Sequence, residues 1–200
     1  MSDDLFPNFR KAFNPVNLRQ ILDPERPKPA PIVQELGGNI FAFQREIVRV
    51  AGDGAVGKSM FLLELTANGS AGGLMLYADR VMWIDEEGDE EILSERLRAL
   101  DVDVDEIEPR FRYLLNESIA LDDISYREAV FAEIEEFKPD AIVIDSSTRI
   151  HSTLQENSND DMGMLYNLAI RPMSRQYGAT VFIIDHTNKS TGRTRGAGDK

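Results

Sequence analysis

The sequence predicts an α/β fold in which a mostly parallel sheet is covered by helices on both faces. From residue 46 onward, apolar runs of strand length alternate with segments of helical periodicity. Runs such as AIVID (141–145) and ATVFIID (179–185) are apolar without a two-residue alternation, which is typical of strands buried on both faces. Parallel strands connected by covering helices satisfy both observations.

Five strands and four helices are expected in this pattern. The segment 89–100 shows the helical pattern clearly, because Leu93, Leu97 and Leu100 recur on one face. Loops are expected at 68–73 and 152–160, which are rich in turn-forming residues. The expected strands are 46–52, 81–85, 110–116, 141–145 and 179–185, and the expected helices are 57–68, 89–100, 125–137 and 160–178, the last interrupted by Pro172.

Residues 1–36 are expected to form an N-terminal arm ahead of a folded domain at 37–200. Most of the prolines lie in these first residues, and the stretch ERPKPAP (25–31) lacks the amide donors of a helix or central strand. Proline-rich arms of this kind are semi-rigid spacers. Docking on a neighbouring subunit and docking on another protein both remain open for it.

Composition limits the class of protein. The 200 residues fit one domain, and 42% hydrophobic with 28% charged residues is ordinary for a chain that folds in water. The absence of cysteine excludes disulfides and thiolate metal sites. No apolar run reaches the roughly 18–20 residues of a membrane span, and the N-terminus lacks the features of a signal peptide. We therefore expect a cytoplasmic protein that does not enter the membrane.

The net charge of −13 is unevenly distributed. Residues 85–136 carry 19 acidic and 5 basic residues, whereas the remainder is close to neutral. A broad basic face for nucleic acid is therefore excluded, and any such contact must come from a local loop. The one basic cluster consists of Lys189, Arg193, Arg195 and Lys200.

The segment GDGAVGKS (52–59) matches G-x-x-x-x-G-K-[ST] between a predicted strand and a predicted helix. Its glycines allow consecutive amides to surround a polyphosphate, and the helix N-terminus adds partial positive charge. Lys58 would contact the β- and γ-phosphates, and the Ser59 hydroxyl would bind Mg²⁺. The alternative is a glycine-rich turn followed by a solvent-exposed lysine. The predicted nucleotide-binding residues are Gly52, Asp53, Gly54, Ala55, Val56, Gly57, Lys58, Ser59 and Met60.

Two acidic strand ends are candidates for the rest of this site. Asp145 ends a buried strand and is the expected second ligand for Mg²⁺, although it could instead cap a turn. Asp85, Glu86 and Glu87 follow another strand, and one of them could activate a water molecule. Simple solvation of a helix start explains this acidity equally well.

The two histidines have different prospects. His186 follows the last predicted strand, where a neutral imidazole could contact the γ-phosphate and report its loss, but a turn residue is the alternative. His151 has no neighbours at the spacing of metal ligands.

From about residue 40 the chain resembles RecA-like ATPases, most closely RepA-type hexameric replicative helicases and the ATPase domains fused to phage and plasmid primases. The matching segments appear in the family's order. They are GDGAVGKS, WIDEEGDEEILSERLRAL, PDAIVIDSSTRI, GATVFIIDHTNKS and RTRGAGDK. The resemblance implies a RecA-like P-loop NTPase fold and ATP hydrolysis that requires Mg²⁺.

The resemblance also implies roles for single residues. Glu87, ahead of Arg96, matches the carboxylate that polarises the hydrolytic water, Asp145 matches the Walker B aspartate, and His186 matches the sensor. In the family a basic residue of one subunit reaches the γ-phosphate of the next. Arg195 is nearest to that pattern, with Lys189 and Arg193 as alternatives.

Partners follow from the same resemblance. A homo-oligomer, as a hexameric ring or filament with nucleotide at the subunit interface, is implied, together with single-stranded DNA at the basic C-terminal loop. The sequence departs from the family at Met60 and Asp185, and it stops at Lys200, before the further strands of a complete RecA-like sheet. The chain is therefore expected to be a fragment or a shortened relative.

Three functions are compatible with these motifs. The first is an ATPase that acts on single-stranded DNA, with ATP favoured over GTP because no N-K-x-D motif follows the phosphate loop. The second is a regulatory or assembly module controlled by nucleotide, which the acidic 85–136 segment suits as a protein-binding surface. The third, a small-molecule kinase, would need an arginine-rich lid, for which only Arg149, Arg171 and Arg175 are available.

Overall fold

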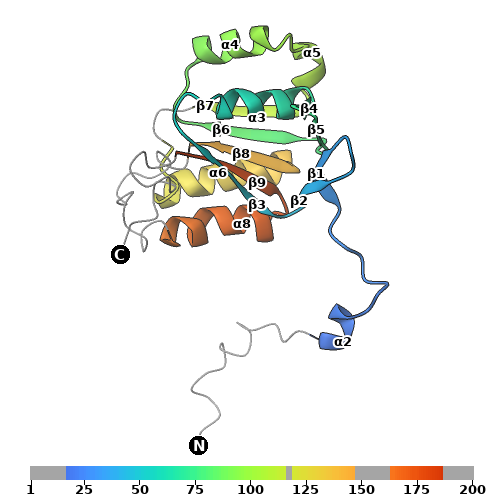
Figure 1. Cartoon of the computed structure of the whole chain (residues 1–200). Coiled ribbons are helices and arrows are strands. Elements are labelled where there is room, and N and C mark those ends of the chain that lie inside the picture. The colour runs from blue at the N-terminus through green and yellow to red at the C-terminus, as the bar shows by residue number, and fades with distance from the viewer. Residues whose placement is uncertain (1–16, 116–118, 147–162, 187–200) are drawn as a thin grey trace, which may run out of the picture.

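The fold is built on a parallel five-stranded sheet with strand order β3-β9-β8-β6-β7 (Figure 1). The structure is a computed structural model, and it describes residues 17–115, 119–146 and 163–186. It confirms the predicted α/β class, and two strands have the bounds expected from the sequence. The strands are β3 (Ile47–Gly52), β6 (Val81–Asp85), β7 (Phe111–Leu115), β8 (Ala141–Asp145) and β9 (Thr180–His186).

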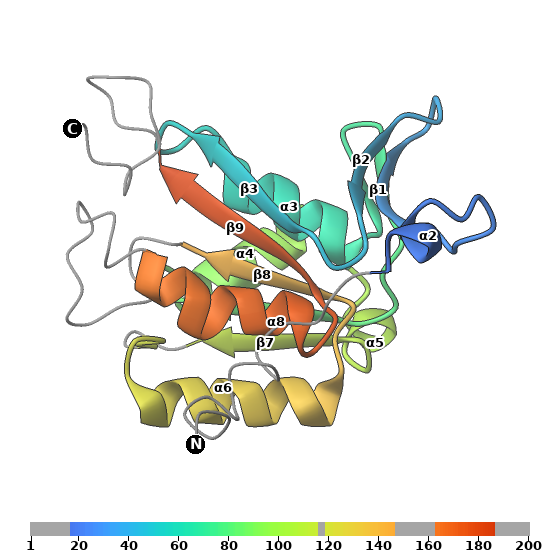
Figure 2. The ribbon, with the colours of Figure 1, turned by 90° about the horizontal axis from the view of Figure 1, so that it is seen from below.

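Helices cover both faces of this sheet (Figures 1 and 2). Alternate residues of each strand point to opposite faces, so Met82 and Ile84 pack in one apolar cluster while Val81 and Trp83 pack in the other. Two buried faces explain why the strands read as continuous apolar runs. One face carries α3 (Lys58–Ala67), α4 (Glu90–Ala99) and α5 (Val104–Ile107), and the other carries α6 (Ile124–Phe137), η1 (Tyr166–Ile170) and α8 (Arg171–Arg175).

The helix expected at 160–178 is irregular where it is described. The π-helix η1 runs directly into α8, and Pro172 lies in the first turn of α8. Proline has no amide hydrogen, so it cannot bond the carbonyl four residues earlier, and a wider turn precedes it. The predicted interruption at Pro172 is therefore a change of helix type.

A second, antiparallel sheet with order β2-β1-β5-β4 was not expected. It lies at the end of the molecule where the main strands begin, because their arrowheads point away from it in Figure 2. Its strand β4 falls inside the segment 68–73 that was expected to be a loop. The strands are β1 (Pro31–Glu35), β2 (Ile40–Phe43), β4 (Ser70–Ala71) and β5 (Leu74–Leu76).

The N-terminal arm differs from the sequence expectation at its boundary. Residues 31–35, expected in the arm, form the inner strand β1, and Ile32 and Val33 are buried. Pro31 is tolerated because it is the first residue of its strand. Residues 17–30 are exposed and contain the single-turn helix α2 (Leu18–Ile21), which stands away from the domain in Figure 1.

Charged side chains tie the helix ends to the main sheet at its amino end. Arg110 donates to the carbonyl of Ala67 at the end of α3 over 2.9 Å. Arg80 donates to the carbonyl of Phe137 at the end of α6 over 2.8 Å. Asp140 accepts the backbone N–H groups of residues 79 and 80 over 2.9 and 3.0 Å. These residues precede strands and satisfy backbone groups that the helices and strands leave open.

No helix within the described ranges combines the length and the apolar character that a bilayer crossing requires.

Candidate active site

The predicted phosphate loop connects β3 to α3 at the carboxyl end of the main sheet. Ala55 and Gly57 have left-handed backbone angles, with φ of 60° and 88°. Gly57 is the N-cap of α3, and no side chain caps the first turn. A Cβ atom added at Gly57 would meet nothing within 4 Å. No capping side chain therefore occupies the first amides of α3, as an anion-binding helix N-terminus requires.

Lys58 lies across this loop. Its Nζ donates to the carbonyl of Gly52 over 2.9 Å and to the carbonyl of Asp53 over 2.7 Å. The ammonium group is thus held beside the amides that would bind phosphate. A polyphosphate bound there would meet a full positive charge as well as the helix N-terminus.

Ser59 and Asp145 lie close together. Ser59 follows the phosphate loop after β3 and Asp145 ends β8, and β9 lies between these two strands in the sheet. The Ser59 hydroxyl bonds to the Asp145 carboxylate, which is buried. The pKa of Asp145 is raised to about 6, mainly by burial and also by the charges of Asp85 and Glu87, against the opposing effects of the Ser59 bond and of Arg96. A nearby cation would stabilise the charged form of a carboxyl group in this position.

The donor set at this point fits Mg²⁺. Mg²⁺ is usually bound through one or two carboxylates, with phosphates and water completing its octahedron. Ser59 and Asp145 supply a hydroxyl and one carboxylate beside the phosphate loop. In the part of the chain that the structure describes, no group of three or more His, Asp or Glu side chains could hold a metal by itself.

The carboxylates of Asp85, at the end of β6, and of Glu87, just after it, occupy different environments. Asp85 is buried, and its Oδ1 accepts the N–H groups of Glu87 and Gly88 over 2.8 Å each. Its Oδ2 accepts the hydroxyl of Tyr113 over 2.5 Å. Glu87 accepts the hydroxyl of Ser146, the neighbour of Asp145, over 2.5 Å. Of these carboxylates, Glu87 thus reaches across from β6 to the end of β8.

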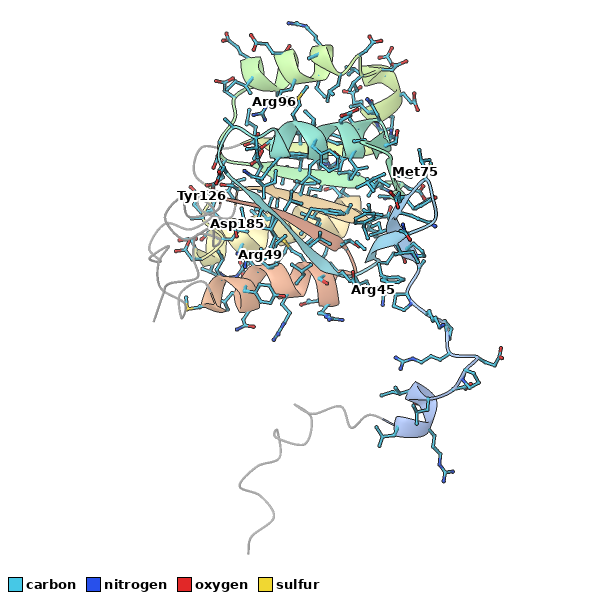
Figure 3. The ribbon with its side chains drawn as sticks, viewed as in Figure 1. Arg45, Arg49, Met75, Arg96, Tyr126 and Asp185 are labelled. Atoms are coloured by element: carbon cyan, nitrogen blue, oxygen red, sulfur yellow. The ribbon has the colours of Figure 1, made fainter. Side chains whose placement is uncertain are left out.

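The backbone at the ends of β6 and β8 is also joined directly. The N–H of Glu86 donates to the carbonyl of Asp145 over 3.0 Å. Asp145 and Ser146 are connected by a cis peptide bond. Arg96 extends from α4 on the same side of the sheet as the phosphate loop helix (Figure 3). The predicted site residues Glu87, Asp145 and Ser59 therefore lie together at the carboxyl end of the sheet.

Other predicted residues fall outside this description. His186 is the last residue of β9, and its side chain lies outside the described residues. His151 and the three finger candidates Lys189, Arg193 and Arg195 also lie outside them.

Sequence reasoning missed two cross-strand contacts at this end of the sheet. Asp185, treated only as a departure from the family, is buried and forms an ion pair with Arg49 on β3 (Figure 3). Tyr113, which bonds Asp85, was not singled out. A charged residue inside each of two apolar strand runs was the available signal for the first contact, because a buried charge needs a partner.

The parallel sheet covered on both faces, the phosphate loop at the start of α3 and the Ser59–Asp145 contact define a P-loop NTPase with a RecA-like fold. The family model described as "AAA domain" matches residues 14–192, and the chain belongs to this P-loop ATPase family. This membership supports the predicted nucleotide binding and ATPase activity in general terms. No curated protein matches the chain.

Proposed function

We infer that this protein hydrolyses ATP with Mg²⁺ and acts on single-stranded DNA in replication or recombination, as a helicase-type motor similar to the RepA group. The observation that supports ATP hydrolysis is the Ser59–Asp145 contact beside the phosphate loop. Ser146, which follows Asp145 in the chain, donates a hydrogen bond to Glu87. Phosphoryl transfer depends mainly on positioning and charge stabilisation, which this arrangement can supply.

Each residue has a defined task in this proposal. Lys58 neutralises charge on the β- and γ-phosphates, and the amides of residues 52–59 bind the remaining oxygens. Ser59 and Asp145 hold Mg²⁺, which when bound neutralises charge on the phosphates. Glu87 accepts a hydrogen bond from the attacking water and orients it toward the γ-phosphate. His186 acts as the sensor of that phosphate.

The partner part of the proposal rests on the family resemblance and on charge. Arg195 of a neighbouring subunit contacts the γ-phosphate in a ring or filament. The acidic segment 85–136 repels a phosphate backbone, so single-stranded DNA is assigned to the basic cluster at the C-terminal end. A cytoplasmic location goes with this activity.

Steady-state ATP hydrolysis with and without single-stranded DNA tests the proposal. We expect turnover that requires Mg²⁺, rises with DNA and is lost in Lys58→Ala. Lys28→Ala is the matched control, because Lys28 is an exposed lysine of the arm. Turnover that persists in Lys58→Ala would contradict the proposed site, and turnover unaffected by DNA would contradict the motor.

A second candidate is an ATP-binding regulatory or assembly module whose nucleotide controls oligomerisation or a protein partner. The acidic surface is the observation in its favour, since α4 and the turn before α5 carry many exposed carboxylates. DNA binding measured against salt concentration separates the two. A motor loses affinity steeply as salt rises, whereas the module binds no DNA at any salt concentration.

A further inference from the structure

The carboxylate assigned to the attacking water is carried by a turn that follows β6. Asp85 begins this turn and fixes it from inside, because one oxygen of its buried carboxylate accepts the N–H groups of both Glu87 and Gly88. An aspartate that bonds backbone amides two and three residues ahead holds a local turn. The backbone position of Glu87 therefore depends on the side chain of Asp85.

The other oxygen of Asp85 is fixed by a neighbouring strand. Tyr113 on β7 donates its hydroxyl to Oδ2 over 2.5 Å. The Tyr113 ring stacks on Trp83, with ring centres 5.8 Å apart and planes 8° from parallel. Trp83 is fully buried and is the cross-strand partner of Tyr113 in the sheet. The phenol is thus anchored by packing, and it leaves the Asp85 carboxylate one orientation.

Gly88 shows how closely the turn is fitted to this carboxylate. A Cβ atom added at Gly88 would lie 2.5 Å from Oδ2 of Asp85. No real Cβ atom tolerates such a distance, so any other residue would push the carboxylate or the turn aside. Gly88 does not have a positive φ, so its backbone angles do not require glycine. The close approach of Asp85 does.

We propose that Asp85 and Tyr113 are positioning residues that hold Glu87 against Ser146 at the end of β8. The inference rests on the proposed function, in which Glu87 orients the water. Asp85 is unsuited to that task itself, because its two oxygens already accept three hydrogen bonds. The reaction rate is sensitive to the position of a reacting group, since about 1 Å of misplacement can lower a rate by about 10²-fold.

The main test compares kcat and KM for ATP in Asp85→Ala. We expect kcat to fall by about 10- to 100-fold while KM stays within about twofold, because the phosphate loop keeps its own contacts. Asp85→Asn should restore most of kcat, since its carbonyl oxygen can still accept both backbone N–H groups. A loss in Asp85→Asn as large as that in Asp85→Ala would overturn the inference.

Two further variants test the same chain of contacts without removing the carboxylate. Tyr113→Phe keeps the ring stack but removes the hydroxyl, and Gly88→Ala forces the turn away from Asp85. Both should lower kcat without changing KM. Tyr177→Phe is the matched control, because the Tyr177 ring also packs against an aromatic ring, that of Phe131, beside the other apolar cluster. These variants also replace Asp85→Ala if that protein does not fold.

Combination with Glu87→Gln separates positioning from a general structural role. If Asp85 acts through Glu87, Asp85→Ala lowers turnover no further in the Glu87→Gln background. An additional loss there, or weaker nucleotide binding, would overturn the inference. Wild-type turnover in Glu87→Gln is a different result, because it contradicts the proposed function and removes the basis of this inference with it.

Discussion

The two ends of the main sheet use charged residues in opposite ways. At the amino end, Arg80, Arg110 and Asp140 each bond backbone groups at the ends of helices or strands. At the carboxyl end, Asp85 also bonds backbone N–H groups, but Asp145 beside it is buried with a raised pKa. The first arrangement stabilises the fold. The second arrangement destabilises the charged form of Asp145 as long as no cation is bound, as is common at ligand-binding sites.

The largest effect should come from the carboxyl end, in Glu87→Gln. We expect ATP turnover to fall by about 10²- to 10⁴-fold, because a positioned base contributes about that much. The free energy of unfolding should stay nearly unchanged. Hydrolysis assays and chemical denaturation measure the two quantities, and Glu90→Gln in the first turn of α4 is the matched control. Equal losses in both variants would refute the special position of Glu87.

Asp145→Asn should uncouple stability from activity. The folded protein holds the Asp145 proton up to about pH 6, whereas the unfolded chain releases it near pH 3.8, so ionisation disfavours the folded state above this range. Asn cannot ionise. In metal-free buffer at pH 7.5 we therefore expect the variant to be more stable by about 1–3 kcal/mol, and to have lost Mg²⁺-dependent hydrolysis.

Denaturation at several pH values checks the sign of this effect. The advantage of Asp145→Asn should be complete above about pH 6 and should disappear as the pH falls toward 4. An advantage that is the same at pH 4 and pH 7.5 would show that ionisation of Asp145 is not its cause.

Asp140→Ala should give the reverse result at the amino end. Two backbone amides lose their acceptor, so we expect the free energy of unfolding to fall by about 1–2 kcal/mol. The kcat and KM for ATP should not change. Asp79→Ala is the matched control, since the Asp79 carboxylate makes neither of these bonds. A change in kcat in Asp140→Ala would break the division between the two ends.

The smallest effect is expected at the sheet edge, in Arg112→Ala. Arg112 bonds Glu133 over 2.7 Å and Glu136 over 3.4 Å, but all three side chains reach solvent. Such pairs contribute about 0.2–1 kcal/mol and weaken with salt. Denaturation at low and high salt should therefore show a difference from wild type below about 1 kcal/mol that shrinks in high salt. A larger, salt-independent loss would instead identify packing of Arg112 over Phe137 as the main contribution.

Local sequence patterns predicted the main sheet well and the small sheet not at all. Residues 81–85 and 141–145 are strands with the predicted bounds, because a buried strand is one continuous apolar run. The strand β1 begins at a proline and is completed by β5, about forty residues later, so no local period identifies it. Pairing between distant short strands is a property of the folded chain.

The candidate site divides in the same way. The phosphate loop is one contiguous motif, and Asp145 is marked by the end of an apolar run, so both could be predicted. The bond from Tyr113 to Asp85 joins residues 28 apart, and the ion pair of Arg49 with Asp185 joins residues 136 apart. Spacing carries no information about such contacts, because they depend on strand order.

The two bonds from Lys58 to its own loop have a consequence for ligand preference. The lysine already has acceptors in the carbonyls of Gly52 and Asp53, so a ligand must compete with the backbone for it. A single phosphate that reaches only the amides offers the ammonium nothing better. A longer anionic chain replaces neutral carbonyls with charged oxygens, which form stronger hydrogen bonds. We therefore expect the loop to bind triphosphates more tightly than diphosphates, and monophosphates most weakly.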